Sequence, residues 1–259
     1  FPTRRSSDLS PWVGKIGAMR PKLLIEGLAT FFLCLACALV QGGLAPFIIG
    51  ALLLALVYIG GPVSQAHYNP AVTLAFCVRR RQAWSAGAAY VGVQFLAALL
   101  AALIAGLYHG HTEENSEHIL EALKKPVLEG WLPDTSAEFF GAFLLAFVIL
   151  VVATSRRTVG NNYYGLAIAA TVAGLMGVFG ALSPDFNPAV SLCRAIEGCF
   201  SVLNCEGSVG LAIQQEVSYL AHSTPRLLLA LAAQLTGAAL AAWAFLGIFP
   251  EEQIGRAHV

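Results

Sequence analysis

Two Asn-Pro-Ala-Val motifs, Asn69–Val72 and Asn187–Val190, are the residues of this sequence best suited to act on a solute. Each motif is a good helix start, because Asn can cap with its side-chain oxygen and Pro at the first helical position loses no needed hydrogen bond. Two short helices that meet N-terminus to N-terminus inside a membrane would aim two positive dipole ends and two carboxamide donors at one point. Such a point favours neutral, oxygen-bearing solutes and repels cations.

The composition predicts a membrane protein. Of the 259 residues, 57% are apolar and only 12% are charged, whereas a soluble domain has about 25% charged residues. The mean hydropathy is +0.70 and the net charge is zero, so the lipid bilayer is the expected surrounding and nucleic acid is not an expected partner. The length suits one membrane domain of about six spans at roughly 20 residues each.

The two ends of the sequence carry no functional weight in this interpretation. Residues 1–9 (FPTRRSSDL) and 254–259 (IGRAHV) match what common sequencing-adapter DNA encodes when it is read in frame. We interpret both as read-through, with ordinary polar tails as the alternative. The expected domain is then a single one over residues 10–253.

The elements that must position the two motifs follow from the apolar runs. Six runs are long enough to cross a bilayer: about residues 22–41, 45–62, 84–108, 136–154, 163–182 and 225–249. Two shorter apolar segments, 69–78 and 187–196, each begin with a motif and are interpreted as re-entrant half-helices. A membrane tolerates such broken backbone only where it is buried or lines a watery cavity. The predicted class is therefore an all-α membrane protein with six transmembrane helices and two half-helices.

The chain contains an internal repeat. Glu26 leads the segment EGLATF at the start of the first span, and Glu138 leads EFFGAF at the start of the fourth. The repeats cover about residues 22–108 and 136–249. With three spans each they have opposite topology, and a site near the bilayer midplane is what inverted repeats produce.

The second repeat is longer than the first. From Asn187 to Gln234 the chain runs 22 residues longer than from Asn69 to Gln94, which occupies the matching place in the first repeat. The extra residues fall at roughly 198–224, on the outer side of the predicted topology.

Positive charge predicts that both termini are cytoplasmic. One side of the six-span topology carries Lys15, Arg20, Lys22, Arg79, Arg80, Arg81, Arg156 and Arg157, and the other carries Lys124, Lys125, Arg194 and Arg226. The run Arg79–Arg81 is interpreted as a topology anchor rather than as a lipid-recognition site.

These features together resemble the aquaporin and aquaglyceroporin family, the major intrinsic proteins. The resemblance rests on the two glutamate-led spans, the segments SQAHYNPAVTLAF and SPDFNPAVSL, and Gln94, and it covers nearly all of residues 22–249. It implies an aquaporin-like fold of six tilted helices with two half-helices, a pore through each subunit and a homotetramer in the plasma membrane or the bacterial inner membrane.

The resemblance also implies residue roles. Asn69 and Asn187 would be the pore donors that orient a passing water, and His67 matches a pore-lining histidine. Glu26 and Glu138 would be buried carboxylates that brace the loops carrying the half-helices, and not proton-transfer groups.

One departure from the family pattern bears on selectivity. The family places an arginine three residues after the second Asn, where this chain has Val190; the other aligned constriction residues are Ile49, Leu175 and Pro184. The expected constriction is apolar and has lost its fixed positive charge. It could admit solutes larger than water, or an apolar ring could dewet and conduct poorly.

Arg194 lies one helical turn beyond Val190 and is the candidate vestibule charge. The alternatives are snorkelling to the interface or pairing with Asp185 or Glu197. The aspartate that glycerol-conducting relatives place just after the second motif is also absent, with Ser191 and Leu192 in its place.

Other polar residues give weaker signals. Cys34 and Cys37 are interpreted as packing residues, Cys193 as a candidate for mercurial block, and Cys199 and Cys205 as a pair that could form a disulfide in an oxidising compartment. The His- and Glu-rich loop 109–131 is expected to be a solvated acidic loop, so no metal site and no cofactor are predicted. The sequence has no Walker A, G-x-S-x-G or H-E-x-x-H motif, and we do not expect an enzyme.

The sequence therefore predicts a passive transmembrane channel for water or small uncharged solutes, with an unusually apolar outer constriction. Alternatives within channels are a pore specialised for ammonia, hydrogen peroxide, carbon dioxide or urea with low water flux. Alternatives from other classes are a secondary transporter built on inverted repeats and a structural membrane protein with a closed pore.

Overall fold

The computed structural model describes residues 11–109, 130–182, 184–203 and 209–253, and within them the chain is helical with no strand. The helices are α1 (Pro11–Leu39), α2 (Ala45–Ser64), α3 (Pro70–Val78), α4 (Trp84–His109), α6 (Trp131–Thr154), α7 (Tyr164–Phe179), α8 (Pro188–Leu203) and α9 (Val209–Ile248). Three short 3-10 turns follow helices: η2 (Arg156–Thr158), η3 (Gly180–Leu182) and η4 (Pro250–Glu252). The all-α prediction is confirmed.

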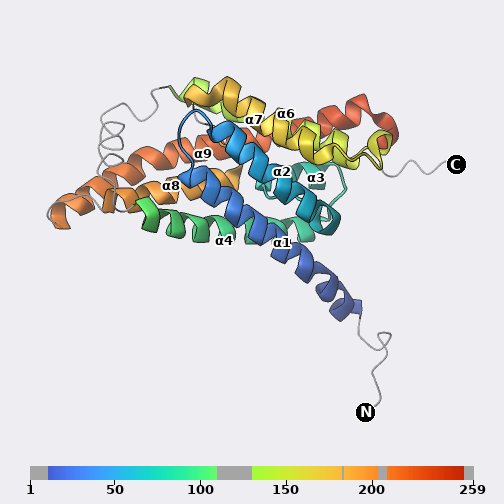
Figure 1. The fold of residues 1–259 in the computed structure, drawn as a ribbon, viewed down its shortest axis with the longest axis horizontal. Coiled ribbons are helices and arrows are strands. Elements are labelled where there is room, and N and C mark those ends of the chain that lie inside the picture. Colours follow the sequence, from blue (N-terminus) through green and yellow to red (C-terminus); the bar gives the residue numbers. More distant parts are fainter. Residues whose placement is uncertain (1–10, 110–129, 183, 204–208, 254–259) are drawn as a thin grey trace, which may run out of the picture.

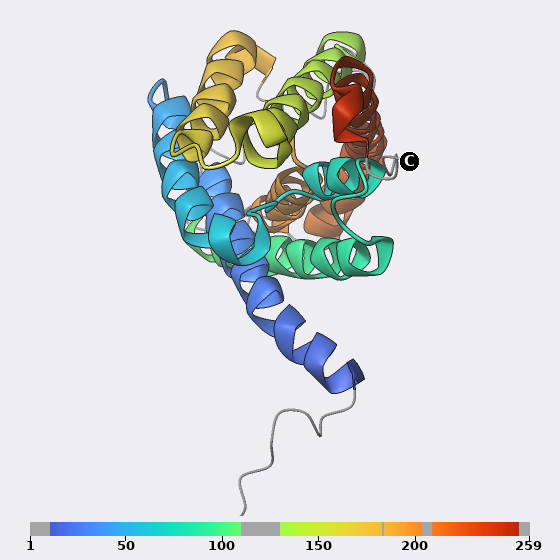
Figure 2. The same cartoon turned by 90° about the vertical axis from the view of Figure 1, so that its right-hand side faces the viewer.

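The long helices form a ring around the two half-helices. Around the ring, α4 packs on α1, α1 on α2, α2 on α7, α7 on α6 and α6 on α9. Between α4 and α9 the ring is completed by the half-helices α3 and α8, because each of them contacts both of these long helices. The long helices run side by side in Figure 1, and Figure 2 shows them end-on around the short ones. The start of α1 and the end of α9 lie at the same end of the bundle, as an even number of spans requires.

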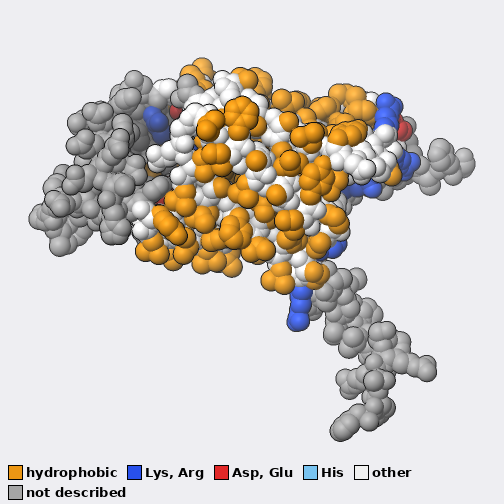
Figure 3. Space-filling view, in the orientation of Figure 1, with side chains coloured by type: hydrophobic (Ala, Val, Ile, Leu, Met, Phe, Trp, Pro, Cys, Tyr) orange, Lys and Arg blue, Asp and Glu red, His pale blue; other side chains and the backbone are white. Residues whose placement is uncertain are grey.

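The outward faces of the ring are apolar, as a lipid-facing surface must be. Within the described part of the chain, five helices are long and apolar enough to span a membrane: Met19–Leu39, Ala45–Ser64, Trp84–Tyr108, Trp131–Thr154 and Ser218–Ile248. Large apolar side chains such as Leu24, Phe47 and Trp243 are between 62% and 74% exposed on them. The space-filling view shows a broad apolar band with most of the visible Lys and Arg at one end (Figure 3).

The fifth predicted span, α7, is shorter than expected. Its 16 apolar residues cover about 24 Å at 1.5 Å per residue. The 3-10 turn η3 then continues the chain to Leu182, where the prediction placed the end of the span.

Small residues let the second repeat close tightly. A Cβ on Gly237 of α9 would lie 2.4 Å from the backbone oxygen of Phe139 in α6, so only glycine permits this approach. A Cβ on Gly141 of α6 would lie 2.0 Å from the ring of Phe186, the residue that precedes the second motif. The close α6–α9 contact therefore depends on glycine rather than on side-chain interdigitation.

The extra residues of the second repeat extend two helices. The half-helix α8 runs to Leu203, beyond the predicted end at residue 196, and α9 begins at Val209, so that both project past the bundle at the left of Figure 1. They touch near the bundle, where the Tyr219 hydroxyl donates to the Ala195 carbonyl at 3.0 Å. Residues 204–208 between them, with Cys205 of the possible disulfide, lie outside the described part of the chain, as do residues 110–129 of the acidic loop.

Candidate pore

The two Asn-Pro-Ala motifs start the half-helices in the way that their residues predict. Asn69 has extended backbone, and its Oδ1 accepts from Ala71 N at 2.8 Å and Val72 N at 3.4 Å. In the second half-helix, Asn187 Oδ1 accepts from Ala189 N at 3.0 Å. Both caps leave the Nδ2 donors available for other partners.

The caps are joined across the centre of the bundle. Asn69 Nδ2 donates to Phe186 O at 2.9 Å, and Asn187 Nδ2 donates to Tyr68 O at 3.0 Å. Tyr68 and Phe186 have φ values of 50° and 54°, a left-handed conformation that L-residues adopt at a cost. Each carboxamide has a second N–H, and both Asn residues line one cavity, which is described below. Two donors therefore remain for a solute in that cavity.

Glu26 holds the loop that enters the first half-helix. Its Oε1 accepts from Ser64 Oγ at 2.6 Å and from His67 N at 2.9 Å. Its Oε2 accepts from Tyr68 N at 2.8 Å and Gln94 Nε2 at 2.9 Å. The carboxylate is fully buried and its oxygens are occupied by four donors.

Glu138 does the same for the second half-helix. Its oxygens accept from Asp185 N at 2.9 Å, Phe186 N at 2.8 Å and Gln234 Nε2 at 2.8 Å. Gln234 also donates to Ser191 Oγ at 2.8 Å, as Gln94 donates to Thr73 Oγ1 at 3.2 Å in the first repeat. The two repeats thus contain the same brace, with Ser191 in the place of Thr73.

A cavity of about 630 Å³ extends from the end of the bundle that holds the α1–α2 loop to the paired Asn residues. We call this end the outer end and the opposite end the inner end. A second cavity, of about 470 Å³, opens toward the end where the chain terminates, and Arg81, Ser155 and Asn161 line it. Val57, Ala66 and Ile168 line both cavities, so the two cavities are adjacent.

Three of the four predicted constriction residues line the outer cavity, namely Ile49, Pro184 and Val190. The fourth, Leu175, is buried in the same apolar core as Ile49 and Val190 but is not among the residues that line the cavity, whereas its neighbour Met176 is. Met176 is apolar, as Leu175 is.

Arg194 lies at the outer end of the same cavity. Its Nη1 lies 2.9 Å from Asp185 Oδ1, and both side chains line the cavity. Pairing with Asp185 was one of the alternatives for Arg194, and the structure combines it with a place in the vestibule. Among the described residues that line this cavity, these two are the only charged ones.

His67 lines the cavity, and one of its two ring nitrogens is buried without a partner among the described residues. Its ring is buried against Phe76, with centroids 4.1 Å apart, and its Nε2 has no hydrogen-bond partner among the described residues. Its Nδ1 lies 3.1 Å from Thr73 Oγ1, which also lies 3.0 Å from the Asn69 carbonyl and 3.2 Å from Gln94 Nε2. We assign the Thr73 proton to the carbonyl, which places the ring proton on Nδ1 and makes Nε2 an acceptor.

The thiols are placed differently from the prediction. Cys193 is fully buried and faces the Cys34 carbonyl, so it is not the reachable thiol. Cys37, which was expected to be a packing residue, is half-buried and lines the outer cavity. No group of three or more His, Cys, Asp or Glu side chains that could hold a metal occurs in the described part of the chain.

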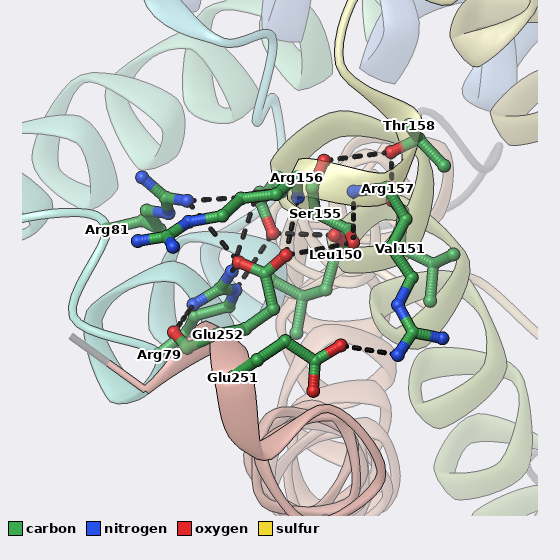
Figure 4. Close-up of polar contacts among 11 residues, drawn as sticks. Arg79, Arg81, Leu150, Val151, Ser155, Arg156, Arg157, Thr158, Glu251 and Glu252 are labelled. Carbon is green, nitrogen blue, oxygen red and sulfur yellow. Dashed lines mark hydrogen bonds and ion pairs between the residues drawn. The ribbon is translucent and has the colours of Figure 1, made fainter. Parts of the chain in front are cut away.

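One polar cluster at the inner end was not predicted. Arg79 is 1% exposed, and its guanidinium reaches Glu252 Oε2 at 2.9 Å and Thr154 Oγ1 at 2.9 Å. It also lies 4.4 Å from the centre of the Phe245 ring. The other carboxylate oxygen of Glu252 accepts from Ser155 Oγ and Arg156 N (Figure 4). No sequence signal links residue 79 to residue 252, because the contact joins a half-helix to the end of the last span.

Comparisons with known proteins agree with this geometry. Residues 22–245 match the family described as "Major intrinsic protein". The chain is 35% identical over 189 residues to "Aquaporin NIP1-1" of Oryza sativa subsp. japonica, covering 68% of this chain and 64% of that protein. It is 32% identical over 219 residues to "Aquaporin NIP3-1" of Arabidopsis thaliana, covering 77% and 65%. The chain thus spans a little under two thirds of the length of these relatives.

The fold is similar to one that has been solved by crystallography. The "X-ray structure of the aquaglyceroporin from Plasmodium falciparum" superposes with a TM-score of 0.63 at 17% identity, covering 92% of this chain and all of that one. At this identity the likeness bears on the fold alone, and it supports the aquaporin-like arrangement of spans and half-helices. Because the family match covers most of the sequence, this chain belongs to the major intrinsic protein family.

Proposed function

We propose that the protein is a passive transmembrane channel for water and small uncharged solutes. The observation that supports the proposal is the pair of adjacent cavities, the outer of which is lined by Asn69 and Asn187. Two fixed donors and two half-helix N-termini favour a neutral solute with an acceptor atom, and they oppose a cation. Family membership supports a channel rather than an enzyme.

The outer wall sets what can enter. Ile49, Met176, Pro184 and Val190 give it an apolar surface, and Val190 takes less room than a long basic side chain would. A solute loses water contacts there without gaining side-chain hydrogen bonds, so strongly hydrated ions are excluded by dehydration. Solutes wider than water but weakly hydrated are expected to pass.

The apolar wall also favours a second candidate function within channels. If the ring of Ile49, Met176 and Val190 dewets, water flux is low and the pore serves ammonia, hydrogen peroxide, carbon dioxide or urea. A transporter mechanism has less support, because the buried carboxylates Glu26 and Glu138 are occupied by fixed donors and have no room to bind and release an ion.

The surroundings of the channel are proposed from the family. We expect a homotetramer in the plasma membrane or the bacterial inner membrane, with both ends of the chain in the cytoplasm. The basic residues Arg81, Arg156 and Arg157 contact Glu251 or Glu252 just after the last span, which supports that orientation.

The test is stopped-flow light scattering on proteoliposomes with water, glycerol and urea gradients run in parallel. Val190→Arg is expected to lower glycerol and urea entry about tenfold, because its long side chain fills the outer cavity. Val190→Ala is the matched control for a change without bulk or charge, and it should keep solute entry. No flux above that of empty liposomes for any of the three solutes would contradict the water and urea channel and favour the gas-permeable or closed-pore alternatives.

A further inference from the structure

The ion pair between Asp185 and Arg194 joins two residues that differ in their electrostatic effect on the second half-helix. Asp185 lies two residues before the helix cap Asn187, so its carboxylate sits beside the N-terminus of α8. A carboxylate there offsets the positive end of the half-helix dipole, which is one of the features that oppose cations at the pore centre. Taken alone, Asp185 would therefore make the pore mouth attractive to cations.

A backbone hydrogen bond to Glu138 fixes the position of Asp185. Its backbone N–H donates to Glu138 at 2.9 Å, within the brace that holds the second half-helix. Its side chain is only 14% exposed, while that of Arg194 is 42% exposed. The carboxylate is thus the deeper of the two groups, and the guanidinium covers it from the outer side.

The first repeat makes the same contact without charge. His67 and Phe76 occupy the places, two residues before and seven residues after Asn69, that Asp185 and Arg194 occupy relative to Asn187. Their rings lie 4.1 Å apart, where the second repeat has an ion pair with a separation of 2.9 Å. The contact is therefore a shared feature of the two repeats, and only its outer version places charge in the cavity.

We infer that Arg194 determines the ion selectivity of this channel by neutralising Asp185, and not by acting as a free positive charge at the mouth. With the pair intact, the only two charged side chains among the described residues that line the outer cavity cancel. The positive half-helix ends then remain the dominant field at the centre, so neutral solutes pass and cations do not. This inference rests on the proposed channel function and specifies how it excludes cations.

The test is a double-mutant cycle on cation leak in proteoliposomes. Proton entry is followed with a trapped pH-sensitive dye under a potassium diffusion potential. Arg194→Gln is expected to raise the leak about tenfold, because it leaves the Asp185 carboxylate uncompensated. Asp185→Asn should stay at the wild-type level, and the double variant Arg194→Gln/Asp185→Asn should return to it. Arg194→Lys keeps the charge and should resemble the wild type.

Glu197 supplies the matched control. It is an acid on the same helix within electrostatic reach of Arg194, but it is not among the residues that line the cavity. The variant Arg194→Gln/Glu197→Gln should remain as leaky as Arg194→Gln. Restoration by this variant, or a double variant with Asp185→Asn that leaks as much as Arg194→Gln alone, would overturn the assignment to Asp185.

A second readout does not depend on conduction. Cys37 lines the same cavity and lies within electrostatic reach of both Asp185 and Arg194. Labelling of the Cys37 peptide by cationic and anionic methanethiosulfonate reagents, followed by mass spectrometry, reports the local potential. Arg194→Gln should raise the ratio of cationic to anionic labelling about tenfold, and Asp185→Asn should reverse that rise. An unchanged ratio in Arg194→Gln would refute the inference even if no solute flux were found, whereas absent flux with the expected ratios would refute only the channel.

Discussion

At the scale of single residues, the site is decided by which atom of a polar group is already in use. Asn69 and Asn187 each use Oδ1 to cap a helix and one N–H to bind the opposite loop, so a solute meets only the second N–H. In the assigned tautomer His67 donates Nδ1–H to Thr73, and its Nε2 is buried without a partner among the described residues. The Asn residues therefore offer two donors at the pore centre, which suit a solute that carries an acceptor atom.

Thr73 tests this assignment. Thr73→Val keeps the shape but removes the hydroxyl that serves His67, Gln94 and the Asn69 carbonyl, and we expect about 1–3 kcal/mol lower unfolding free energy in detergent. Nitrogen NMR of labelled histidine should then show His67 losing its fixed Nδ1–H tautomer. The matched change in the other repeat is Ser191→Ala, which removes the acceptor of Gln234 and should leave the His67 signal unchanged. An identical His67 tautomer in Thr73→Val would refute the assignment.

At the scale of elements, glycine decides how near the helices approach. The α6–α9 contact is tight because Gly237 lies against the backbone of Phe139. Backbone atoms cannot move aside as the end of a flexible side chain can. The apolar run at residues 225–249 predicted a span without giving any information about this contact. Hydropathy locates a helix in the membrane, but it does not say which face meets which neighbour.

Gly237→Ala should therefore be costly. The new methyl group would overlap the Phe139 carbonyl and push α6 and α9 apart, so we expect a loss of about 1–3 kcal/mol in unfolding free energy. Gly247→Ala on the same helix meets no atom within 4 Å, and it should be neutral or stabilise by up to about 1 kcal/mol. Thermal unfolding of both variants in detergent distinguishes the cases, and equal melting temperatures would contradict the packing argument.

At the scale of the whole molecule, the last turn of the chain holds the inner end of the pore together. Glu252 bonds Arg79 of the first half-helix region and Ser155 after α6, and Ser155 also lines the inner cavity (Figure 4). Burial opposes ionisation of Glu252, but hydrogen bonds from Arg156 N–H, Ser155 and Arg79 outweigh it and hold the pKa of its carboxyl below the usual 4.5.

The sign of the pH dependence follows. A lowered pKa in the folded state means that Glu252 contributes stability above pH 4.5 and loses it as the pH falls through the lower folded value. Glu252→Gln should cost roughly 3 kcal/mol at neutral pH, because Arg79 is left buried without its charge partner, and it should flatten the acid end of the stability curve. The neighbouring Glu251 pairs with Arg157 at the surface, so Glu251→Gln should change stability by only about 0–1 kcal/mol. Unfolding of the three proteins in detergent from pH 7 to pH 3 is the measurement, and equal acid sensitivity of the wild type and Glu252→Gln would contradict it.

The sequence by itself determined the features that local chemistry specifies. Asn followed by Pro favours a helix start, and an apolar run of about 20 residues is long enough to span a bilayer, so the two half-helices, the apolar spans and the repeat were predictable. The repeat also led from Glu26 to Glu138 and from Gln94 to Gln234, because the same sequence pattern recurs at matching places.

The tertiary structure alone decided which side chains face the pore and which distant residues meet. Met176 rather than Leu175, and Cys37 rather than Cys193, line the cavity, because helix rotation is set by packing against neighbours and not by spacing from a motif. The same holds for Arg79 with Glu252. A pair separated by most of the chain leaves no periodic signal, and burial makes its two charges depend on each other.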